Sequence, residues 1–321
     1  MGTSGGGRTA PRIQSRWFRG DWADRVRALA EGRLTPVEPR RAATVMLLRD
    51  AAAPSPDDSG HPVTPDPAGG DGVAVFLLRR RASLGFAARM HAYPGGGVDP
   101  RDETPVAWAG PGRAEWAARL GLAGTAPDDV AEAQAQAVVC AAVRETFEES
   151  GVLLAGPDAD SVVADTTGPD WEADRAALVA RELSFAAFLA RRRLVLRSDL
   201  LGLWARWITP EFEERRYDTW FFTAALPAGQ RARNLSTEAD RTGWLTPRQA
   251  LRSVDRGEVA MLPPTLATLR ELAAHDSVAA VLAAAGRRAV SPVQARVRRQ
   301  GGTLVISWPG YEEFEERIPV A

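Results

Sequence analysis

Three glutamates, Glu145, Glu148 and Glu149, lie close together in the stretch AAVRETFEESGVLLA at residues 141–155. On a helix these positions fall at i, i+3 and i+4, so their carboxylates project from one face close to one another. Like charges at that spacing repel, and they destabilise a helix unless a cation or a basic neighbour neutralises them. Hard oxygen ligands of this kind suit Mg²⁺ or Mn²⁺. The pattern therefore predicts a divalent-metal site.

The neighbours of these acids are mostly apolar, because residues 141–143, Phe147 and residues 152–154 are all Ala, Val, Leu or Phe. An apolar helix face packs against a core, so the acidic face of such a helix is expected to line a cleft. The alternative is an ordinary solvent-exposed helix face, since glutamate is mostly exposed in proteins. The acids alone leave both interpretations open.

The helix that carries the acids is predicted over residues 125–151, where Asp128 or Asp129 can begin it and Gly151 can end it. Before it, the sequence predicts a helix at 21–32, strands at 40–50 and 72–81, a Pro/Gly/Asp-rich loop at 51–72, and a glycine-rich turn at 93–97. After it come a short strand at 152–156, a helical stretch at 171–194, strands at 204–209 and 215–226, a strand running into a helix at 236–258, helices at 263–286, and a hairpin at 295–310. Thr246 and Pro247 can start the helix of the 236–258 stretch.

Composition narrows the possible classes of function. The chain has 321 residues, 45% of them hydrophobic, and 40 Lys+Arg against 41 Asp+Glu give a net charge of −1. This balance, with no apolar run of about 18 residues, predicts no nucleic-acid partner and no membrane span. The single cysteine, Cys140, excludes an intrachain disulfide and fits a reducing, cytoplasmic location. The first residues show no signal-peptide pattern and are expected to form a flexible lead-in.

The order of residues 144–152, RETFEESGV, together with YPGGGVDPRDE at residues 93–103, resembles the signature of the Nudix hydrolases. That signature has a glycine, then a glutamate, then Arg-Glu-apolar-any-Glu-Glu-any-Gly-apolar. This chain matches the second half at each specified position except one, where Thr146 replaces the apolar residue.

The first half departs from the signature. From Gly95 to Arg144 is 49 positions (144 − 95), far more than a contiguous motif allows, so an insertion divides it. One branch of the family has such a divided motif, the coenzyme A diphosphatases of the peroxisomal "moiety X motif 19" type. This chain resembles that branch in LLRRRASLGFAARMHAYPGGGVD, CAAVRETFEESGVLL and WITPEFEERRYDTWFFTAAL, and the likeness covers most of residues 40–270.

The resemblance implies an α/β class fold, a Nudix α/β/α sandwich with a mixed sheet and a helical insertion. It places a lead-in with a short helix at 1–38 and a Nudix domain at 39–275, with insertions at about 103–127 and 157–203. Residues 276–321 are then expected to be an extension made of a helix end and a hairpin.

The resemblance also implies roles for the acidic cluster. In Nudix enzymes the glutamates that match Glu145, Glu148 and Glu149 hold divalent cations that bridge a diphosphate, which here means Mg²⁺ or Mn²⁺. Arg144 is expected to orient a carboxylate through a bidentate pair. Such a site lowers the pKa of a bound water and stabilises the negative charge of in-line diphosphate hydrolysis.

Other site residues are expected around this cluster. Backbone N–H groups of the glycine triplet can approach a substrate or a metal ligand closely, because no side chain intervenes. The triplet is Gly95, Gly96 and Gly97. The general base is left open, and an ordinary solvated loop acid is the alternative for the upstream pair. The candidates are Glu238, then Asp102 and Glu103 upstream of the helix, then Glu213 and Glu214.

Arginines at the end of the second strand are candidates for holding phosphate. Alternation places Arg79 and Arg81 on one face of that strand, and the resemblance favours Arg81 for coenzyme A recognition. The expected partner is a small nucleoside diphosphate derivative, preferably coenzyme A or an acyl derivative. The alternatives are ADP-ribose, dinucleotides or nucleoside triphosphates as substrate, or a Nudix-fold regulator without catalysis. The oligomeric state is left open.

Overall fold

The computed structural model describes residues 21–51, 72–82 and 87–320. Its main element is a nine-stranded mixed sheet in the order β11-β3-β2-β1-β9-β8-β12, with β10 paired to β2 and β4 paired to β1. Its longer strands are β1 (Arg40–Asp50), β2 (Val73–Arg80), β8 (Gly202–Ile208), β9 (Tyr217–Ala225) and β10 (Ala239–Leu245). Its short strands are β3 (Met90–Ala92), β4 (Gly95–Gly97), β11 (Ala260–Met261) and β12 (Pro292–Gln294). The predicted α/β class with a mixed sheet is confirmed.

Strand β1 lies at the centre of this sheet. It runs parallel to β9, and its other edge is shared by β4 at one end and β2 at the other. Residues 42–48 are buried without a break. A strand covered on both faces reads as a near-continuous apolar run, and the sequence AATVMLL is apolar except for Thr44.

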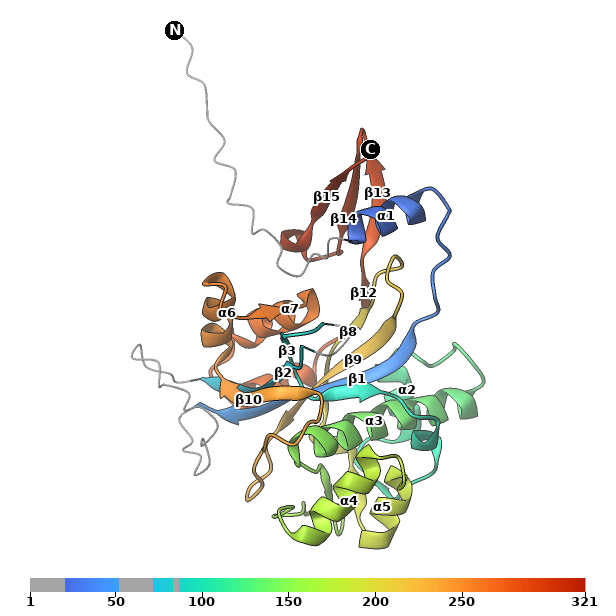
Figure 1. The fold of residues 1–321 in the computed structure, drawn as a ribbon. Helices are drawn as coiled ribbons and strands as arrows, with labels where there is room; N and C mark the ends of the chain where they lie inside the picture. Colours follow the sequence, from blue (N-terminus) through green and yellow to red (C-terminus); the bar gives the residue numbers. More distant parts are fainter. Residues whose placement is uncertain (1–20, 52–71, 83–86, 321) are drawn as a thin grey trace.

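Four helices cover one face of the main sheet (Figure 1), and a small sheet contributes to the same core. They are α2 (Arg113–Arg119), α3 (Asp128–Ser150), α4 (Pro169–Val179), α5 (Phe185–Arg192), and the strands β5 (Trp108–Ala109), β6 (Ala155–Gly156) and β7 (Val195–Arg197). Apolar residues of α3 pack against alternate residues of β1, including Ala43 and Val45. The helix ends at Gly151, whose φ of 75° is the left-handed conformation that glycine adopts without strain.

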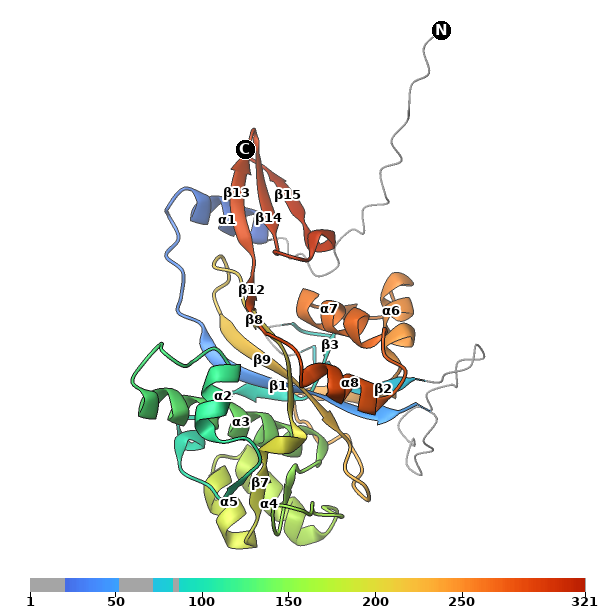
Figure 2. The same ribbon diagram turned by 180° about the vertical axis from the view of Figure 1, so that it is seen from behind.

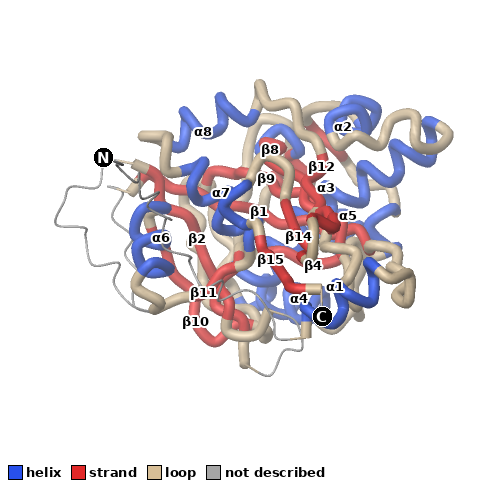
Figure 3. Tube along the Cα trace, turned by 90° about the horizontal axis from the view of Figure 1, so that it is seen from above, coloured by secondary structure: helices blue, strands red, loops and turns tan. Residues whose placement is uncertain are grey.

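Three further helices cover the opposite face, as Figures 2 and 3 show. They are α6 (Pro247–Asp255), α7 (Pro263–Leu272) and α8 (Val278–Ala285). As predicted, Thr246 and Pro247 start α6, because the Thr246 side chain accepts a hydrogen bond from the Gln249 N–H and Pro247 occupies the first turn. Met46 and Leu48 of β1 belong to the core on this side.

The two ends of the described chain lie side by side (Figure 1). Helix α1 (Trp22–Ala30) packs beside a three-stranded sheet of β13 (Arg296–Gln300), β14 (Thr303–Ser307) and β15 (Glu316–Pro319). Short 3₁₀ helices complete the fold at Pro100–Glu103 (η1), Ser198–Leu200 (η2) and Glu312–Phe314 (η3). The predicted C-terminal hairpin is present as β13 and β14, and β15 adds a third strand.

Several elements differ from the sequence-based prediction. The strand expected at 152–156 is reduced to two residues, because 152–154 are buried coil. Helix α2 forms in a segment without clear apolar periodicity, where Trp116 and Ala117 pack into the α3 core. The lead-in to residue 20, and the predicted loop from 52 to 71, lie outside the described residues. Among the described residues, no helix is both long enough and apolar enough to cross a bilayer.

Candidate active site

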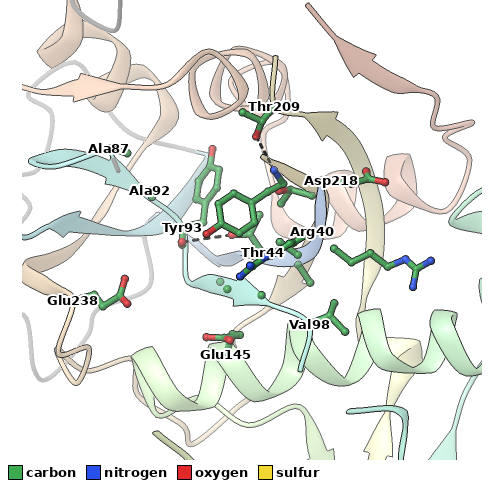
Figure 4. Close-up of a pocket in the computed structure, with 18 of the residues that line it drawn as sticks. Arg40, Thr44, Ala87, Ala92, Tyr93, Val98, Glu145, Thr209, Asp218 and Glu238 are labelled. Carbon is green, nitrogen blue, oxygen red and sulfur yellow. Dashed lines mark hydrogen bonds between the residues drawn. The ribbon is translucent and has the colours of Figure 1, made fainter. Parts of the chain in front are cut away.

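A cavity of about 1560 Å³ lies between the acidic end of α3 and the sheet face covered by α7 (Figure 4). Glu145, Glu148 and Glu149 all line it, so the predicted cleft replaces the alternative of a solvated helix face. Its other walls come from the ends of β1, β4, β8 and β9, from the loop before β10, from the start of α7, and from Trp22 and Trp308 at the two ends of the described chain.

Glu149 is held by two hydrogen bonds. Its Oε2 accepts from the Gly95 N–H at 2.8 Å, and its Oε1 accepts from the Ser236 hydroxyl at 3.0 Å. Only 9% of the residue is exposed. Burial raises the pKa of Glu149 to about 8, and the charge of the neighbouring Glu145 adds to this.

Arg144 connects the remaining acids. Its guanidinium makes a bidentate pair with Asp102, with both N···O distances at 3.0 Å, and also contacts Glu145 at 2.8 Å and Glu148 at 3.2 Å. The side chain of Asp102 is 1% exposed, so this residue is a buried partner of Arg144 rather than a solvated loop acid. Burial raises the pKa of Glu145 to about 7, although the charge of Arg144 opposes the shift.

The glycine triplet packs directly against the acids. A Cβ at Gly96 would lie 2.4 Å from the carboxyl of Glu145, and one at Gly95 would lie 2.6 Å from the carbonyl oxygen of Ala43. Real Cβ atoms do not approach so closely, so a side chain at either position would displace Glu145 or the edge of β1. The carbonyl oxygen of Gly97 accepts a hydrogen bond from Arg144 at 3.0 Å.

Comparisons with known proteins agree with this geometry. The family described as the NUDT19 Nudix domain matches residues 39–272, well over half of the chain. The chain belongs to this family. It is a Nudix hydrolase of the NUDT19 type, and the predicted enzyme class, a Nudix diphosphatase, is confirmed with the family.

Individual relatives support the assignment. The acyl-coenzyme A diphosphatase NUDT19 of Homo sapiens is 29% identical over 274 residues, which span 74% of this chain and 70% of the relative. The Gallus gallus protein of the same name is 27% identical over 281 residues, with 74% and 69% covered. Among solved structures, a NUDIX hydrolase from Alicyclobacillus acidocaldarius superposes with a TM-score of 0.60 at 25% identity, over 80% of this chain and 99% of that one.

The structure rejoins the divided Nudix motif. The inserted segment after Gly97 turns through η1, whose Asp99 and Asp102 form a capping box, and passes through α2 before entering α3. Gln136 of α3 fixes this turn, because its Nε2 donates to the carbonyl oxygens of Asp102, Glu103 and Thr104 at 2.9–3.2 Å. The insertion therefore leaves the glycine turn and the acidic helix in contact.

The sequence alone did not separate Asp102 from Glu103. Asp102 follows Gly96 by six positions (102 − 96) and Glu103 follows Gly97 by six positions (103 − 97), so the same spacing points to both residues. Thr146, the one departure in the second half, is fully buried, and its hydroxyl donates to the Ala142 carbonyl oxygen at 2.7 Å. A hydroxyl at this apolar position is therefore satisfied within the helix. Nothing in the sequence pattern indicated the roles of Ser236 and Gln136.

The donor set of this Nudix site fits a divalent cation, although the side chains do not already converge. Among the described residues, no three His, Cys, Asp or Glu side chains stand at the mutual spacing that a metal ion requires. Glu145 and Glu148 turn toward Arg144, and Glu149 turns toward Gly95. Burial raises the pKa of all three glutamates, because it disfavours their charged forms. Nudix hydrolases generally use divalent metals.

The candidates for the general base occupy different environments. Glu238 lines the acidic end of the cavity, with one oxygen 3.2 Å from Arg80, and its charge is close enough to raise the pKa of Glu149 (Figure 4). Glu103 also lines the cavity, but it is exposed. Glu213 is buried in the wall and accepts from the Trp22 Nε1 at 2.8 Å, whereas Glu214 is paired with Arg25 and its side chain is 77% exposed.

The three arginines at the end of β2 have different positions relative to the cavity. Arg80 lines the cavity and pairs with Glu238. Arg81 does not line it, because its Nε donates to the Ala239 carbonyl oxygen at 3.1 Å. Arg79 makes a bidentate pair with Asp240, with N···O distances of 2.6 and 2.7 Å. The predicted coenzyme A contact of Arg81 therefore has no support from its position in this structure.

Proposed function

We propose that this Nudix enzyme hydrolyses the diphosphate linkage of coenzyme A or an acyl-coenzyme A. The products are then phosphopantetheine, or its acyl derivative, and adenosine 3′,5′-bisphosphate. Two relatives that match about three quarters of the chain are acyl-coenzyme A diphosphatases by name, which favours this substrate class. The observation that carries the chemistry is the meeting of three helix glutamates and a glycine turn at one end of a large cavity.

The bound ion in this proposal is Mg²⁺ or Mn²⁺, held by Glu145, Glu148 and Glu149. When bound, such an ion neutralises diphosphate oxygens and lowers the pKa of a coordinated water. The ion pair between Arg144 and Asp102 holds the acidic face of α3 in place. The Gly95 N–H and the Ser236 hydroxyl each donate a hydrogen bond to one carboxylate oxygen of Glu149. Preorganised charges of this kind avoid the cost of reorganising the site during the reaction.

Glu238 is our candidate for the residue that accepts a proton from the attacking water. Its side chain is 52% exposed and lines the same end of the cavity as the three glutamates. Among the described residues its carboxylate makes one ion pair, with Arg80 at 3.2 Å, so a modest rotation frees it. The reducing cytoplasmic location and the absence of nucleic-acid and membrane partners stay predictions. Cys140, on which the location rests, is buried and free.

The experiment that tests this function is a panel of diphosphate compounds incubated with the full-length protein and Mg²⁺, with products identified by mass. The panel contains coenzyme A, two acyl-coenzyme A esters of different chain length, ADP-ribose, a dinucleotide and a nucleoside triphosphate. Release of adenosine 3′,5′-bisphosphate from the coenzyme A compounds supports the proposal. Turnover confined to ADP-ribose, dinucleotides or nucleoside triphosphates contradicts the substrate assignment but not the chemistry, and no turnover contradicts both.

A further inference from the structure

Beyond its acidic end, the cavity continues along the sheet face that α7 covers. Residues Arg40, Ala42 and Thr44 of β1 all line it and alternate along the strand, so they share one face. The same alternation continues into Met46, which belongs to the core under α7. Arg40 therefore stands at the open end of the cavity floor, two residues before the point where Ala42 pairs with Gly97 of β4.

The backbone around Arg40 is fixed, but its guanidinium is available. Its N–H donates to the Arg216 carbonyl oxygen at 2.9 Å, and its register partner on β9 is Tyr217. Within residues 21–51, 72–82 and 87–320, the Arg40 side chain makes no hydrogen bond or ion pair, and the residue is exposed. Figure 4 shows this side chain reaching into the cavity beside Thr44, above the helix that carries Glu145.

Three of the other arginines that line the cavity are already engaged in ion pairs. Arg80 pairs with Glu238 at 3.2 Å, Arg101 with Asp99 at 2.9 Å, and Arg144 with Asp102 at 3.0 Å. Three further lining arginines also make no side-chain bond among the described residues, but none of them stands on the floor. They are Arg41, on the opposite face of β1, and Arg181 and Arg215, in the connections between elements.

A substrate with several phosphates requires positive charge beyond the acidic cluster. The cation at the three glutamates offsets only the phosphates that it contacts, and the acids repel any other phosphate nearby. A guanidinium presents two parallel N–H donors that match two phosphate oxygens, and such charge-assisted bonds are stronger than neutral ones. Within a cavity they are also less screened by solvent than on an open surface.

We propose that Arg40 binds a phosphate group of the substrate and thereby helps to select which diphosphate compounds the enzyme accepts. The inference rests on the proposed function, since coenzyme A carries both a diphosphate and a separate 3′-phosphate on its ribose. Both groups offer the same oxygens to a guanidinium. The two sources are distinguished by removing one of them from the substrate.

The experiment compares wild-type enzyme with Arg40→Ala on coenzyme A and on 3′-dephospho-coenzyme A, both with Mg²⁺. We expect KM for coenzyme A to rise by about 10-fold or more, with a smaller change in kcat, because one charge-assisted contact is lost. A loss confined to coenzyme A assigns Arg40 to the 3′-phosphate, and an equal loss on both compounds assigns it to the diphosphate. Unchanged kcat/KM on both compounds overturns the proposal.

Two further variants test whether the effect of Arg40→Ala comes from a specific phosphate contact, from positive charge in general, or from a change in folding. Arg40→Lys keeps the charge without the planar fork, so it should recover part of the loss. Arg41→Ala removes a charge from the opposite face of the same strand, so it should raise KM less than Arg40→Ala does. Equal effects of Arg40→Ala and Arg41→Ala would show only a general electrostatic contribution and count against the proposal.

Ligand binding to the metal-free protein tests the role of Arg40 without requiring turnover. The metal-free protein is titrated with adenosine 3′,5′-bisphosphate, inorganic pyrophosphate and adenosine. Wild type should bind at least one phosphate compound more tightly than adenosine, and Arg40→Ala should lose that difference. If wild type hydrolyses neither coenzyme A compound, the proposed function has failed, and this titration still decides whether Arg40 binds phosphate. Equal affinities of the two proteins for every compound would refute its role.

Discussion

Gly95 donates its backbone N–H to the Glu149 carboxylate at 2.8 Å across 54 positions of sequence. This bond closes the divided Nudix motif, because it joins the glycine turn to the last turn of α3. The inserted segment between them is held by contacts of its own, including the Asp102–Arg144 pair and the bonds of Gln136. An insertion is tolerated here because the motif depends on contact in space and not on continuity of the chain.

Glu149→Gln should reduce kcat by at least about two orders of magnitude, because it removes negative charge from the cation site and little volume. The amide oxygen can accept from the Gly95 N–H and the amide nitrogen can donate to the Ser236 hydroxyl, so the fold should persist. Steady-state kinetics with Mg²⁺ measure the effect, and thermal unfolding checks the fold. Retention of wild-type kcat in a folded variant would mean that Glu149 is not a metal ligand.

The stability of the metal-free protein should fall as the pH rises from about 5 to about 8. The folded-state pKa values are about 7 for Glu145 and about 8 for Glu149, and both lie above the ordinary value of 4.5. Between those limits the folded protein binds more protons than the unfolded chain, so raising the pH favours unfolding.

Thermal unfolding in the presence of a chelator, across this pH range, measures the effect. Added Mg²⁺ should restore stability more at pH 8 than at pH 5, because the ion competes with protons for the same oxygens. Glu149→Gln, which cannot titrate, should flatten the chelator curve. A metal-free protein that becomes more stable toward pH 8 would contradict the burial of these acids.

Gly96→Ala should reduce kcat/KM by about 10-fold or more, because its Cβ would lie 2.4 Å from the Glu145 carboxyl and would displace it. The matched control is Gly243→Ala in β10, where a Cβ meets nothing within 4 Å and the residue does not line the cavity. Activity and the Mg²⁺ concentration for half-maximal rate are measured for both. Equal activity of the two variants would exclude the close packing of Gly96 on Glu145.

Asp102→Asn should lower the free energy of unfolding by roughly 3 kcal/mol, because it breaks a buried bidentate ion pair and leaves Arg144 undercompensated. The control is Asp240→Asn, which breaks the Arg79–Asp240 pair of the same bidentate geometry at the surface, and its effect should be much smaller. Denaturant unfolding of both variants makes the comparison. A larger loss for Asp240→Asn would contradict the structural role of Asp102.

The sequence by itself determined the parts of this protein that depend on local periodicity. The spacing of Glu145, Glu148 and Glu149 placed three acids on one helix face, Gly151 marked the end of that helix, and Thr246 with Pro247 marked the start of another. The segment at 40–50 was likewise predicted as a strand, and it forms β1, whose residues 42–48 are buried. These features follow from backbone geometry and from neighbours within one or two turns.

Only the tertiary structure decided which distant residues meet these elements. It placed Gly95 and Ser236 on Glu149, gave Arg144 to Asp102 rather than Glu103, and turned Arg81 away from the cavity while Arg40 and Arg80 line it. It also formed α2 in a segment whose apolar residues show no helical periodicity. The physical reason is that loops and strand ends take their positions from long-range packing, whose partners are set by the whole core and not by nearby sequence.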